Sequence, residues 1–531
     1  MTADGRGRAA DARPRFTPRT FFAAAPKRLR AAAVCCIINL GAGKVNKTDR
    51  WIMNKINREA INKKTKIVCT LGPRSCDEAT IEAMAKAGMN VARINASHGS
   101  HEEHAVKIEA VKRVRERLGV PIALLFDTKG PEFRIGAFAE GKVRLKKGDT
   151  FAFTTEDVPG DEKRVSVSYK GLCGEMLPGD RILLNNGLMI FDVTDVRPPE
   201  VICKVVAGGE LSDRKSMFFP DKEFRLKYLS AQDEKDLLYA IEHDVDFIAC
   251  SFVSKAQDIT EVREFLAAHG SRDIDLIAKI ENRAGVNNLA DILAVSDGIM
   301  IGRGDLGVEV PYEELPDIQK NIINECRRAG KRVITATEML ESMITKPRPT
   351  RAEISDVANA VYDGTSAVML SGETAAGDYP VETVAAMSRI VMQAEKNRQF
   401  MQFLRAEDYI IRGASDALSH SACTLAGDIK AKAIVVCTRT GKTAMMVSRF
   451  RPMLNIIGMT SDPKAYRKLA LSWGVTPVLS EEYSSVDVLF HFAKCAARET
   501  GLVSRGDVIV ITGGTPNGRS GNSDLIHISS V

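Results

Sequence analysis

The stretch "DLIAKIENRAG", residues 275–285, decides the fold class. Residues 276–278 form a short apolar run, which is typical of a strand buried on both faces of a parallel sheet. Lys279 and Glu281 follow two residues apart, so both side chains leave the strand on the same face. An unpaired buried charge is costly. The pattern therefore predicts a buried strand whose carboxyl end opens into a polar cavity.

The same pattern recurs along the chain, because eight short apolar runs alternate with amphipathic helical stretches. The runs are residues 66–71, 90–95, 122–127, 247–252, 276–280, 298–301, 332–336 and 367–370. Eight strand and helix units in series predict an α/β fold of the (β/α)₈ TIM-barrel class, formed by residues 63–130 and 222–394. An open doubly wound sheet is the alternative arrangement.

Helix boundaries follow from local signals. Three pairs have capping-box spacing, and two glycines stand where helices should end. The pairs are Ser75 with Glu78, Ser100 with Glu103 and Thr350 with Glu353, and the glycines are Gly88 and Gly119.

Two segments break the alternation. Residues 131–221 show strand-like alternation and turn signals without long helical periods, which predicts a small β-barrel domain inserted after the third strand. After a long helix near residues 380–406, further strands are expected at 433–437, 455–457 and 508–511. Residues 395–531 are therefore expected to form a C-terminal α/β domain.

Composition limits the class of protein. The net charge is +6, but residues 1–62 hold 13 basic and 4 acidic residues, so they carry +9 and the remainder −3. Nucleic-acid binding is therefore not expected, and no apolar run approaches the roughly 20 residues of a membrane span. Eleven dispersed cysteines predict reduced thiols in an intracellular compartment. Residues 1–62 read as a flexible or helical extension, with an Arg-rich organellar transit peptide as the alternative.

Polar residues end the predicted strands, where a barrel of this kind assembles its active site. They are Arg93, Asn95 and Ser97, Asp127, Thr128 and Lys129, Lys279 and Glu281, Asp305, and Thr337. Glu281 and Asp305 follow neighbouring strands, and two carboxylates with room for other oxygens suit Mg²⁺. Arg93 and Lys279 are cations suited to a phosphate or an enolate. Ion pairs that only brace the barrel mouth are the alternative reading.

The sequence resembles the pyruvate kinase family from about Lys66 to the C-terminus. Seven motifs carry the resemblance, and their combination is specific where each alone is not. They are "TKIVCTLGP" (65–73), "GMNVARINASHG" (88–99), "DTKGPEFRIG" (127–136), "IAKIENRAG" (277–285), "GRGDLGVEVP" (302–311), "ATEMLESM" (336–343) and "MLSGETAAGDYP" (369–380).

The resemblance implies phosphoryl transfer from phosphoenolpyruvate to ADP, giving ATP and pyruvate, in a cytoplasmic homotetramer that uses Mg²⁺ (or Mn²⁺) and K⁺. By motif, Glu281 and Asp305 correspond to Mg²⁺ ligands, and Asn95, Ser97, Asp127 and Thr128 to the K⁺ site, with Glu132 associated with K⁺ dependence. Lys279, Thr337 and Arg93 correspond to catalytic residues, and these three with Gly304 and Asp305 to substrate-binding residues. Asn95, His98, Arg134 and Lys215 correspond to nucleotide contacts.

A polar turn in the C-terminal domain, "CTRTGKT" (437–443), resembles the family's loop for an activating sugar phosphate. The corresponding residues are Thr438, Arg439, Thr440, Gly441, Lys442 and Thr443, with "TGGTPNGRSGNSD" (512–524) as the cover. A plain polar turn is the alternative.

Some positions depart from the family pattern: Ala96, Ile135, Asn185, Asn186, Glu338 and the segment 214–224 around Lys215.

Three rival functions remain at this stage. They are a metal-dependent aldolase of the phosphoenolpyruvate and pyruvate barrel group, an aldolase with Lys279 as a Schiff-base lysine, and a catalytically inactive sugar-phosphate sensor.

Overall fold

A computed structural model describes residues 63–397, 409–515 and 523–531, which belong to one compact unit. Residues 1–62, expected to form a flexible or helical extension or a transit peptide, lie outside the described residues. The same is true of the end of the helix expected to reach residue 406 and of part of the cover segment 512–524. None of the described helices is both long and apolar enough to cross a membrane.

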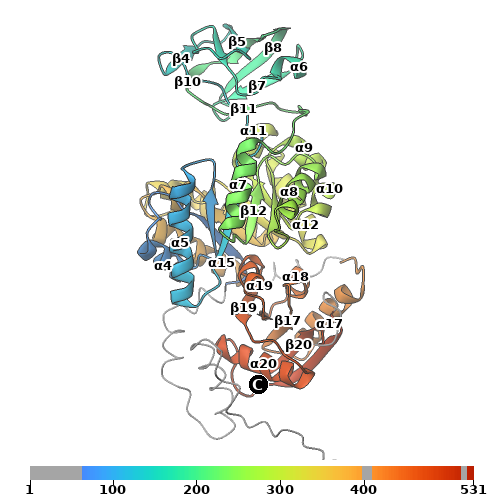
Figure 1. Ribbon diagram of the computed structural model, residues 1–531. Coiled ribbons are helices and arrows are strands. Elements are labelled where there is room, and N and C mark those ends of the chain that lie inside the picture. Colours follow the sequence, from blue (N-terminus) through green and yellow to red (C-terminus); the bar gives the residue numbers. More distant parts are fainter. Residues whose placement is uncertain (1–62, 398–408, 516–522) are drawn as a thin grey trace, which may run out of the picture. The chain divides into compact units, whose positions relative to one another are not determined.

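Eight parallel strands close into a barrel (Figure 1). They are β1 (Lys66–Thr70), β2 (Val91–Asn95), β3 (Ala123–Asp127), β12 (Phe247–Cys250), β13 (Asp275–Ile280), β14 (Gly298–Gly302), β15 (Arg332–Ala336) and β16 (Ala367–Leu370). β1 pairs with both β2 and β16, which closes the ring. The barrel prediction is confirmed, and the open doubly wound sheet is wrong.

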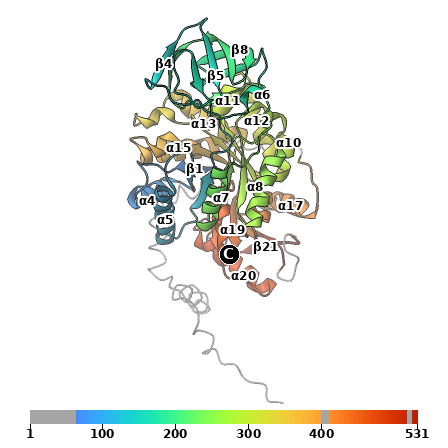
Figure 2. The ribbon, with the colours of Figure 1, turned by 45° about the horizontal axis from the view of Figure 1, so that its top comes forward.

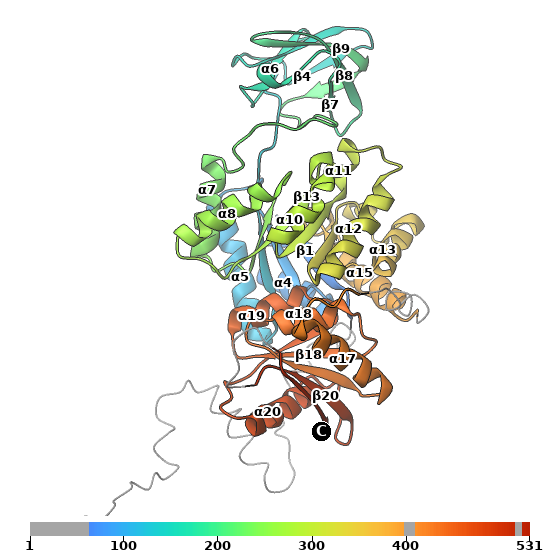
Figure 3. The same cartoon turned by 90° about the vertical axis from the view of Figure 1, so that its right-hand side faces the viewer.

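Eight main helices follow the strands, and Figure 3 shows several of them beside the strands. They are α4 (Glu78–Ala87), α5 (His101–Leu118), α7 (Ala231–Glu242), α8 (Ala256–Ala268), α10 (Leu289–Val295), α12 (Leu315–Ala329), α13 (Arg351–Asp363) and α15 (Pro380–Glu395). Shorter helices occupy the loops: α9 (Arg283–Asn287), α11 (Arg303–Glu309), η1 (Glu341–Ile344) and α14 (Gly372–Ala375). Their apolar faces and the strands form the largest core cluster.

The capping boxes expected at Ser100 and Thr350 are confirmed. The one expected at Ser75 is wrong, because Asp77 caps α4 by accepting the Thr80 amide. The Ser75 hydroxyl instead accepts the amide of Gly72 in the preceding turn. Gly119 closes α5 in the left-handed conformation, and Gly88 closes α4 with a φ of 126°.

The barrel interior is filled by small and branched side chains such as Val68, Ala249 and Ile277. Ala470 and Leu471 of the C-terminal domain belong to the same buried cluster. Apolar packing therefore joins the barrel interior to that domain.

The inserted domain, built mainly of β-strands, is confirmed, and Figure 2 labels several of these strands. Its elements are β4 (Lys142–Leu145), β5 (Thr150–Thr154), β6 (Arg164–Ser166), α6 (Leu172–Glu175), β7 (Arg181–Leu184), β8 (Met189–Arg197), β9 (Glu200–Ala207), β10 (Gly209–Ser212) and β11 (Met217–Phe218). Six strands form one sheet, and β4 with β10 forms a second. Asn185 and Asn186 both have positive φ, the conformation a type I′ turn requires, between β7 and β8.

The segments that enter and leave this insertion pair with each other. Arg134 and Ser216 form an antiparallel bridge, and the Met217 amide donates to the Phe133 carbonyl at 2.8 Å. Both connections therefore lie side by side above the third barrel strand.

The C-terminal α/β domain is confirmed. It contains α17 (Ala414–Asp428), β17 (Ala433–Cys437), α18 (Lys442–Arg449), β18 (Asn455–Thr460), α19 (Pro463–Lys468), η2 (Leu469–Leu471), β19 (Val475–Leu479), α20 (Val486–Glu499), β20 (Val508–Gly513) and β21 (Leu525–Ser530). The sheet order is β19-β18-β17-β20-β21, with only β21 antiparallel to its neighbour.

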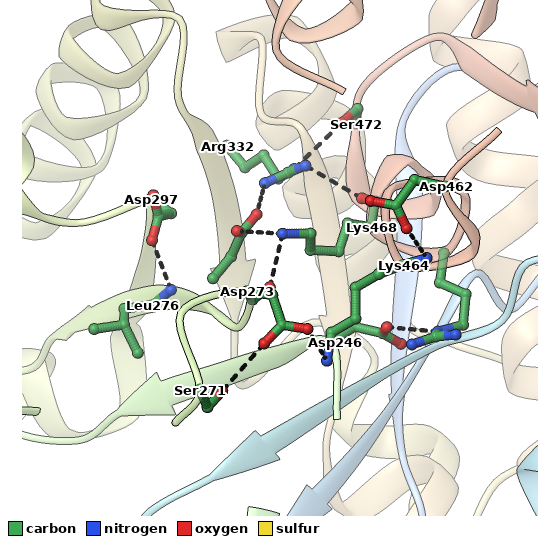
Figure 4. Close-up of polar contacts among 12 residues, drawn as sticks. Asp246, Ser271, Asp273, Leu276, Asp297, Arg332, Asp462, Lys464, Lys468 and Ser472 are labelled. Carbon is green, nitrogen blue, oxygen red and sulfur yellow. Dashed lines mark hydrogen bonds and ion pairs between the residues drawn. The ribbon is translucent and has the colours of Figure 1, made fainter. Parts of the chain in front are cut away.

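Ion pairs join α19 to the amino-terminal ends of the barrel strands (Figure 4). Arg467 binds Asp246 at 2.6 Å, and Lys468 binds Asp275 at 2.7 Å. Asp275 also pairs with Arg332 at 2.7 Å. Asp275 opens β13 and Arg332 opens β15, so these contacts hold the ends of two strands opposite to their polar carboxyl ends.

Candidate active site

Lys279 lies at the centre of a buried charge cluster. Its Nζ is 3.1 Å from Asp127 and 3.0 Å from Glu281, and its side chain is 11% exposed. Burial acts to lower the pKa of Lys279, but the two carboxylates outweigh it and hold that pKa above its ordinary value. Lys279 and Glu281 therefore share one face of β13, as expected, and the lysine stays an ammonium ion.

Arg93 joins the cluster from β2. Its Nε donates to Asp127 at 2.6 Å, and Nη1 donates to the Thr70 hydroxyl at 3.0 Å. Burial acts to raise the pKa of Asp127, but Arg93 and Lys279 reverse this and hold it below its ordinary value. The structure thus brings two of the expected cations to a single carboxylate.

Glu281 and Asp305 face a shared region at the ends of β13 and β14. Glu281 accepts the Phe252 amide at 2.9 Å, and a Cβ placed on Gly302 would lie 2.6 Å from its Oε1. Gly302 is the N-cap residue of α11, whose first turn holds Asp305. Burial and then repulsion from Glu281 raise the pKa of Asp305 to about 7.

These two carboxylates fit a hard divalent cation. They repel each other in a partly buried place, and no hydrogen bond or ion pair engages Asp305 within the described ranges. A divalent cation would relieve that repulsion, and oxygen ligands are those that Mg²⁺ prefers. No group of three or more acidic, histidine or cysteine side chains with metal-binding geometry occurs among the described residues. Mg²⁺ sites with one or two carboxylates usually take their other ligands from substrate and water.

The four residues expected at a K⁺ site come from the ends of β2 and β3. Asn95 and Asp127 are direct neighbours across these strands, and Asn95 accepts the Ser97 amide at 3.2 Å. The Thr128 hydroxyl donates to the Ala249 carbonyl at 3.3 Å. Each of the four side chains carries an oxygen atom, the kind of ligand that a hard monovalent cation requires. Both carboxylate oxygens of Asp127 already accept from cations.

Thr337 lies beyond the end of β15 in a backbone conformation with φ of 68°. Its hydroxyl donates to the Ala336 carbonyl at 2.6 Å and accepts the Gly304 amide at 2.8 Å. Glu338 and Phe252 also have positive φ, at 55° and 56°. Such strain concentrates at functional sites and is held there by the surrounding fold.

Ser251 is a member of the cluster that the sequence reasoning missed. Lys279 donates to its hydroxyl at 2.7 Å, and the same oxygen lies 3.1 Å from Asp127. Ser251 directly follows β12. The rule that strand ends carry the chemistry would have found it, had the fourth predicted strand been read in the same way.

A cavity of about 450 Å³ lies between the inserted domain and the carboxyl end of the barrel. His98 and Arg134, two of the expected nucleotide contacts, line it with Lys129 and Ser97. Lys215 does not line it, but the neighbouring Arg214 does. The cavity is therefore rich in cations, which suits a polyphosphate.

The polar turn 438–443 leads from β17 into α18. Gly441 is the N-cap residue of α18 with a φ of 85°, and its amide donates to the Thr438 hydroxyl at 3.1 Å. Thr443 contacts Ser523 at 3.0 Å, so the turn touches the far end of the expected cover segment. Arg439 accepts the Thr460 hydroxyl through its carbonyl at 3.1 Å.

The sequence matches two protein families. Residues 62–384 match the family described as "Pyruvate kinase, barrel domain", and residues 416–529 match "Pyruvate kinase, alpha/beta domain". The pyruvate kinase of Clostridium acetobutylicum is 42% identical over 470 residues, covering 88% of this chain and 99% of that protein. That of Clostridium perfringens is 43% identical over 472 residues, covering 88% and 100%. That of Staphylococcus haemolyticus is 43% identical over 472 residues, covering 88% and 80%.

Proposed function

Because the chain belongs to the pyruvate kinase family, we propose that it transfers the phosphoryl group of phosphoenolpyruvate to ADP, forming ATP and pyruvate in glycolysis. The observation that supports this most is Lys279, held as an ammonium ion between Asp127 and Glu281 at the carboxyl end of the barrel. Phosphoryl transfer spreads negative charge over oxygen atoms, so preorganised cations supply most of the catalysis.

Lys279 and Arg93 are the protein's own cations for this step. Lys279 would donate to the oxygens of the transferring phosphoryl group, and Arg93 would bind the phosphate of phosphoenolpyruvate. Neither side chain needs to reorient far, because Asp127 anchors both, at 3.1 and 2.6 Å. A preorganised charge costs no reorganisation when the reaction occurs.

Glu281 and Asp305 would hold Mg²⁺ or Mn²⁺, and Asn95, Ser97, Asp127 and Thr128 would hold K⁺, with Glu132 nearby as the carboxylate linked to K⁺ dependence. A divalent ion held by these residues would supply positive charge against the oxygens on which negative charge develops. The mutual repulsion of Glu281 and Asp305 supports this assignment.

Thr337 is proposed to act in protonating the enolate of pyruvate. Its hydroxyl proton is engaged with the Ala336 carbonyl, so it would orient a water molecule rather than deliver its own proton. The Gly304 amide, which donates to Thr337, keeps that hydroxyl in place.

The cation-rich cavity is the proposed nucleotide site. Of the residues carried over from the family, His98 and Arg134 line it, whereas Asn95 and Lys215 lie outside its lining. Glu132 and Arg134 form an ion pair at 2.8 Å beside the entry to the inserted domain. Closing that domain over the barrel would exclude water, which otherwise hydrolyses the phosphoryl donor.

The charge state of Lys279 argues against a Schiff-base aldolase. A lysine that attacks a carbonyl must be neutral, whereas the pKa of Lys279 is held above its ordinary value by two carboxylates once burial is outweighed. A metal-dependent aldolase would use the same acidic residues but has no need of the inserted domain or of the polar turn at 438–443.

A coupled assay tests the proposal. With phosphoenolpyruvate, ADP and lactate dehydrogenase, NADH oxidation should require Mg²⁺ or Mn²⁺ and rise strongly with K⁺ at constant ionic strength. Pyruvate formation that is independent of ADP would contradict a kinase activity. An activity that does not change with K⁺ would contradict the proposed K⁺ site. Treatment with borohydride in the presence of pyruvate should leave Lys279 without a covalently attached pyruvate.

We further propose activation by a sugar phosphate at Thr438–Thr443, and a homotetrameric, cytoplasmic enzyme. A turn of hydroxyls and amides at a helix start suits a phosphate group. The contact of Thr443 with Ser523 supports coupling between the turn and its cover segment. Light scattering in solution would test the tetramer.

A further inference from the structure

A second cavity, with a volume of about 170 Å³, lies where the two connections of the inserted domain meet the barrel. The entry connection contributes Phe133 to its lining, and the exit connection contributes Phe219 and Phe224. Tyr228 and Phe252 line it from the barrel. No residue lines both this cavity and the cation-rich one. A space of this size takes one aromatic ring, since a dry cavity of about 150 Å³ binds benzene.

Three rings from the two connections form one wall of the cavity. The ring centroids of Phe133 lie 5.2 Å from those of Phe219 and 4.7 Å from those of Phe224, and the last two lie 4.9 Å apart. Because each ring packs against both others, the wall is preformed. Phe219 and Phe224 belong to the segment 214–224, where the sequence departs from the pyruvate kinase pattern. The family pattern therefore does not account for this wall.

Two carboxylates of the lining, those of Glu309 and Asp258, form no ion pair with any residue of the ranges 63–397, 409–515 and 523–531. Glu309 lies beside the aromatic wall, because its Oε1 accepts the Phe219 amide at 3.0 Å. Asp258 is 5% exposed and accepts the amides of Ser254 and Lys255 through Oδ2, at 2.9 and 3.1 Å. Burial raises the pKa of both carboxyl groups, to about 7 for Glu309. A cation in the cavity would offset this cost.

The other charged side chains of the lining are compensated or exposed. Lys222 and Glu132 form ion pairs with residues outside the lining, at 2.6 and 2.8 Å. Lys255 and Glu223 are exposed to solvent. Unpaired negative charge beside aromatic rings favours a cation with an apolar body, since an ammonium group is attracted both by carboxylates and by ring faces.

We propose that this cavity binds a small aralkyl ammonium ion, in which a single aromatic ring carries a protonated amine on a short chain. The ring would pack against Phe133, Phe219 and Phe224. The ammonium group would donate to Glu309, and Asp258 would add negative charge to the same cavity. Because such a ligand would contact both connections and the barrel at once, its binding would be coupled to the position of the inserted domain.

Isothermal titration of the full chain with phenethylamine tests the proposal, with phenethyl alcohol as its neutral analogue. The amine should bind saturably with a dissociation constant on the order of 1 mM or below, as a ligand of few atoms allows. The alcohol should bind at least about tenfold more weakly, because it fills the same space without the charge. Equal affinities for the two compounds, or no saturable binding of the amine, would overturn the proposal.

Glu309→Gln tests the role of the carboxylate. The side-chain amide oxygen can still accept the Phe219 amide, while affinity for phenethylamine should fall at least about tenfold and affinity for the alcohol should not change. Glu313→Gln is the matched control, because it removes the same charge at an exposed position outside the lining, and it should bind the amine as the unaltered protein does. Unchanged amine affinity in Glu309→Gln would contradict the assignment.

Crystals of the unaltered protein grown with phenethylamine give a readout that does not depend on a folded variant. Difference density should show a ring against the wall of Phe133, Phe219 and Phe224, with the nitrogen toward Glu309. Density for the amine only elsewhere, or water alone in the cavity, would refute the site. Neither measurement uses the kinase reaction, so a failure here is distinguishable from a failure of the proposed function.

Discussion

Replacing Lys279 by methionine tests the proposed centre of catalysis most directly. The change removes the ammonium that lies 3.1 Å from Asp127, 3.0 Å from Glu281 and 2.7 Å from Ser251, while keeping most of the side-chain length. Loss of one preorganised charge-stabilising group costs about 2.7–4 kcal/mol of barrier, or roughly 10²–10³ in kcat. Phosphoryl transfer in the coupled assay should fall by that factor.

Enolate protonation should survive in the same variant, because no hydrogen bond joins Lys279 to Thr337 or Gly304 among the described residues, and these two keep their own hydrogen bond of 2.8 Å. Exchange of the pyruvate methyl protons with deuterium, followed by NMR, should stay within about tenfold of the unaltered enzyme, a change of about 1.4 kcal/mol. Equal loss of both activities would refute the separate role of Lys279.

Folding must be checked alongside, since breaking a buried ion pair costs about 3–5 kcal/mol of stability. Asp127 still has Arg93 at 2.6 Å, and Glu281 still accepts the Phe252 amide, so the variant should fold with a lowered unfolding midpoint. Lys235→Met, at an exposed position of α7, is the control and should change neither activity.

Three further changes probe the site, the domain contact and the polar turn. Gly302→Ala places a Cβ 2.6 Å from the Glu281 carboxylate, so activity should fall about a hundredfold and half-saturation by Mg²⁺ should rise; an unchanged Mg²⁺ titration would contradict the ligand assignment. Arg332 and Lys468 hold the pKa of Asp275 low, although burial opposes them. The stability that the ionised Asp275 carboxylate gives the folded protein is therefore present above about pH 3.9 and is lost as the pH falls through the pKa of Asp275 in the folded state. Asp275→Asn should therefore lower the urea unfolding midpoint at pH 7 by the equivalent of about 3–5 kcal/mol, with a gap to the unaltered protein that narrows below pH 4; a constant gap would contradict the ion pairing. Lys442→Ala should raise the sugar-phosphate concentration that gives half-maximal activation at least tenfold, measured with a panel of sugar phosphates. If neither the unaltered protein nor the variant is activated by any of them, the proposed effector site is wrong.

The barrel strands were predictable because a strand buried on both faces must be apolar along its whole length. Each of the eight predicted runs overlaps an observed strand; two agree at both ends, and the other six differ by one or two residues at one end. The inserted domain was harder to predict, since its longest strands, β8 and β9, alternate between buried and more exposed residues. Strands such as β8 and β9 were therefore expected only as part of a general β-rich region.

The charged residues at strand ends were found because the barrel topology brings those ends together. Contacts that depend on packing between distant segments were not predictable in this way. The pair between Arg467 and Asp246 joins residues 221 positions apart, and no local pattern marks either residue. Arg451 likewise looks like an ordinary surface residue in the sequence, and only its burial against Trp473 shows otherwise.

The paired entry and exit of the inserted domain have a consequence for how such an enzyme can be built. Because Arg134 and Ser216 face each other across an antiparallel bridge, the chain leaves the ring of strands and returns at almost the same point. The intervening segment can therefore be exchanged, lengthened or replaced by a tight turn without changing how the eight strands close. This geometry is that expected if a separate domain was inserted into a barrel that was already complete.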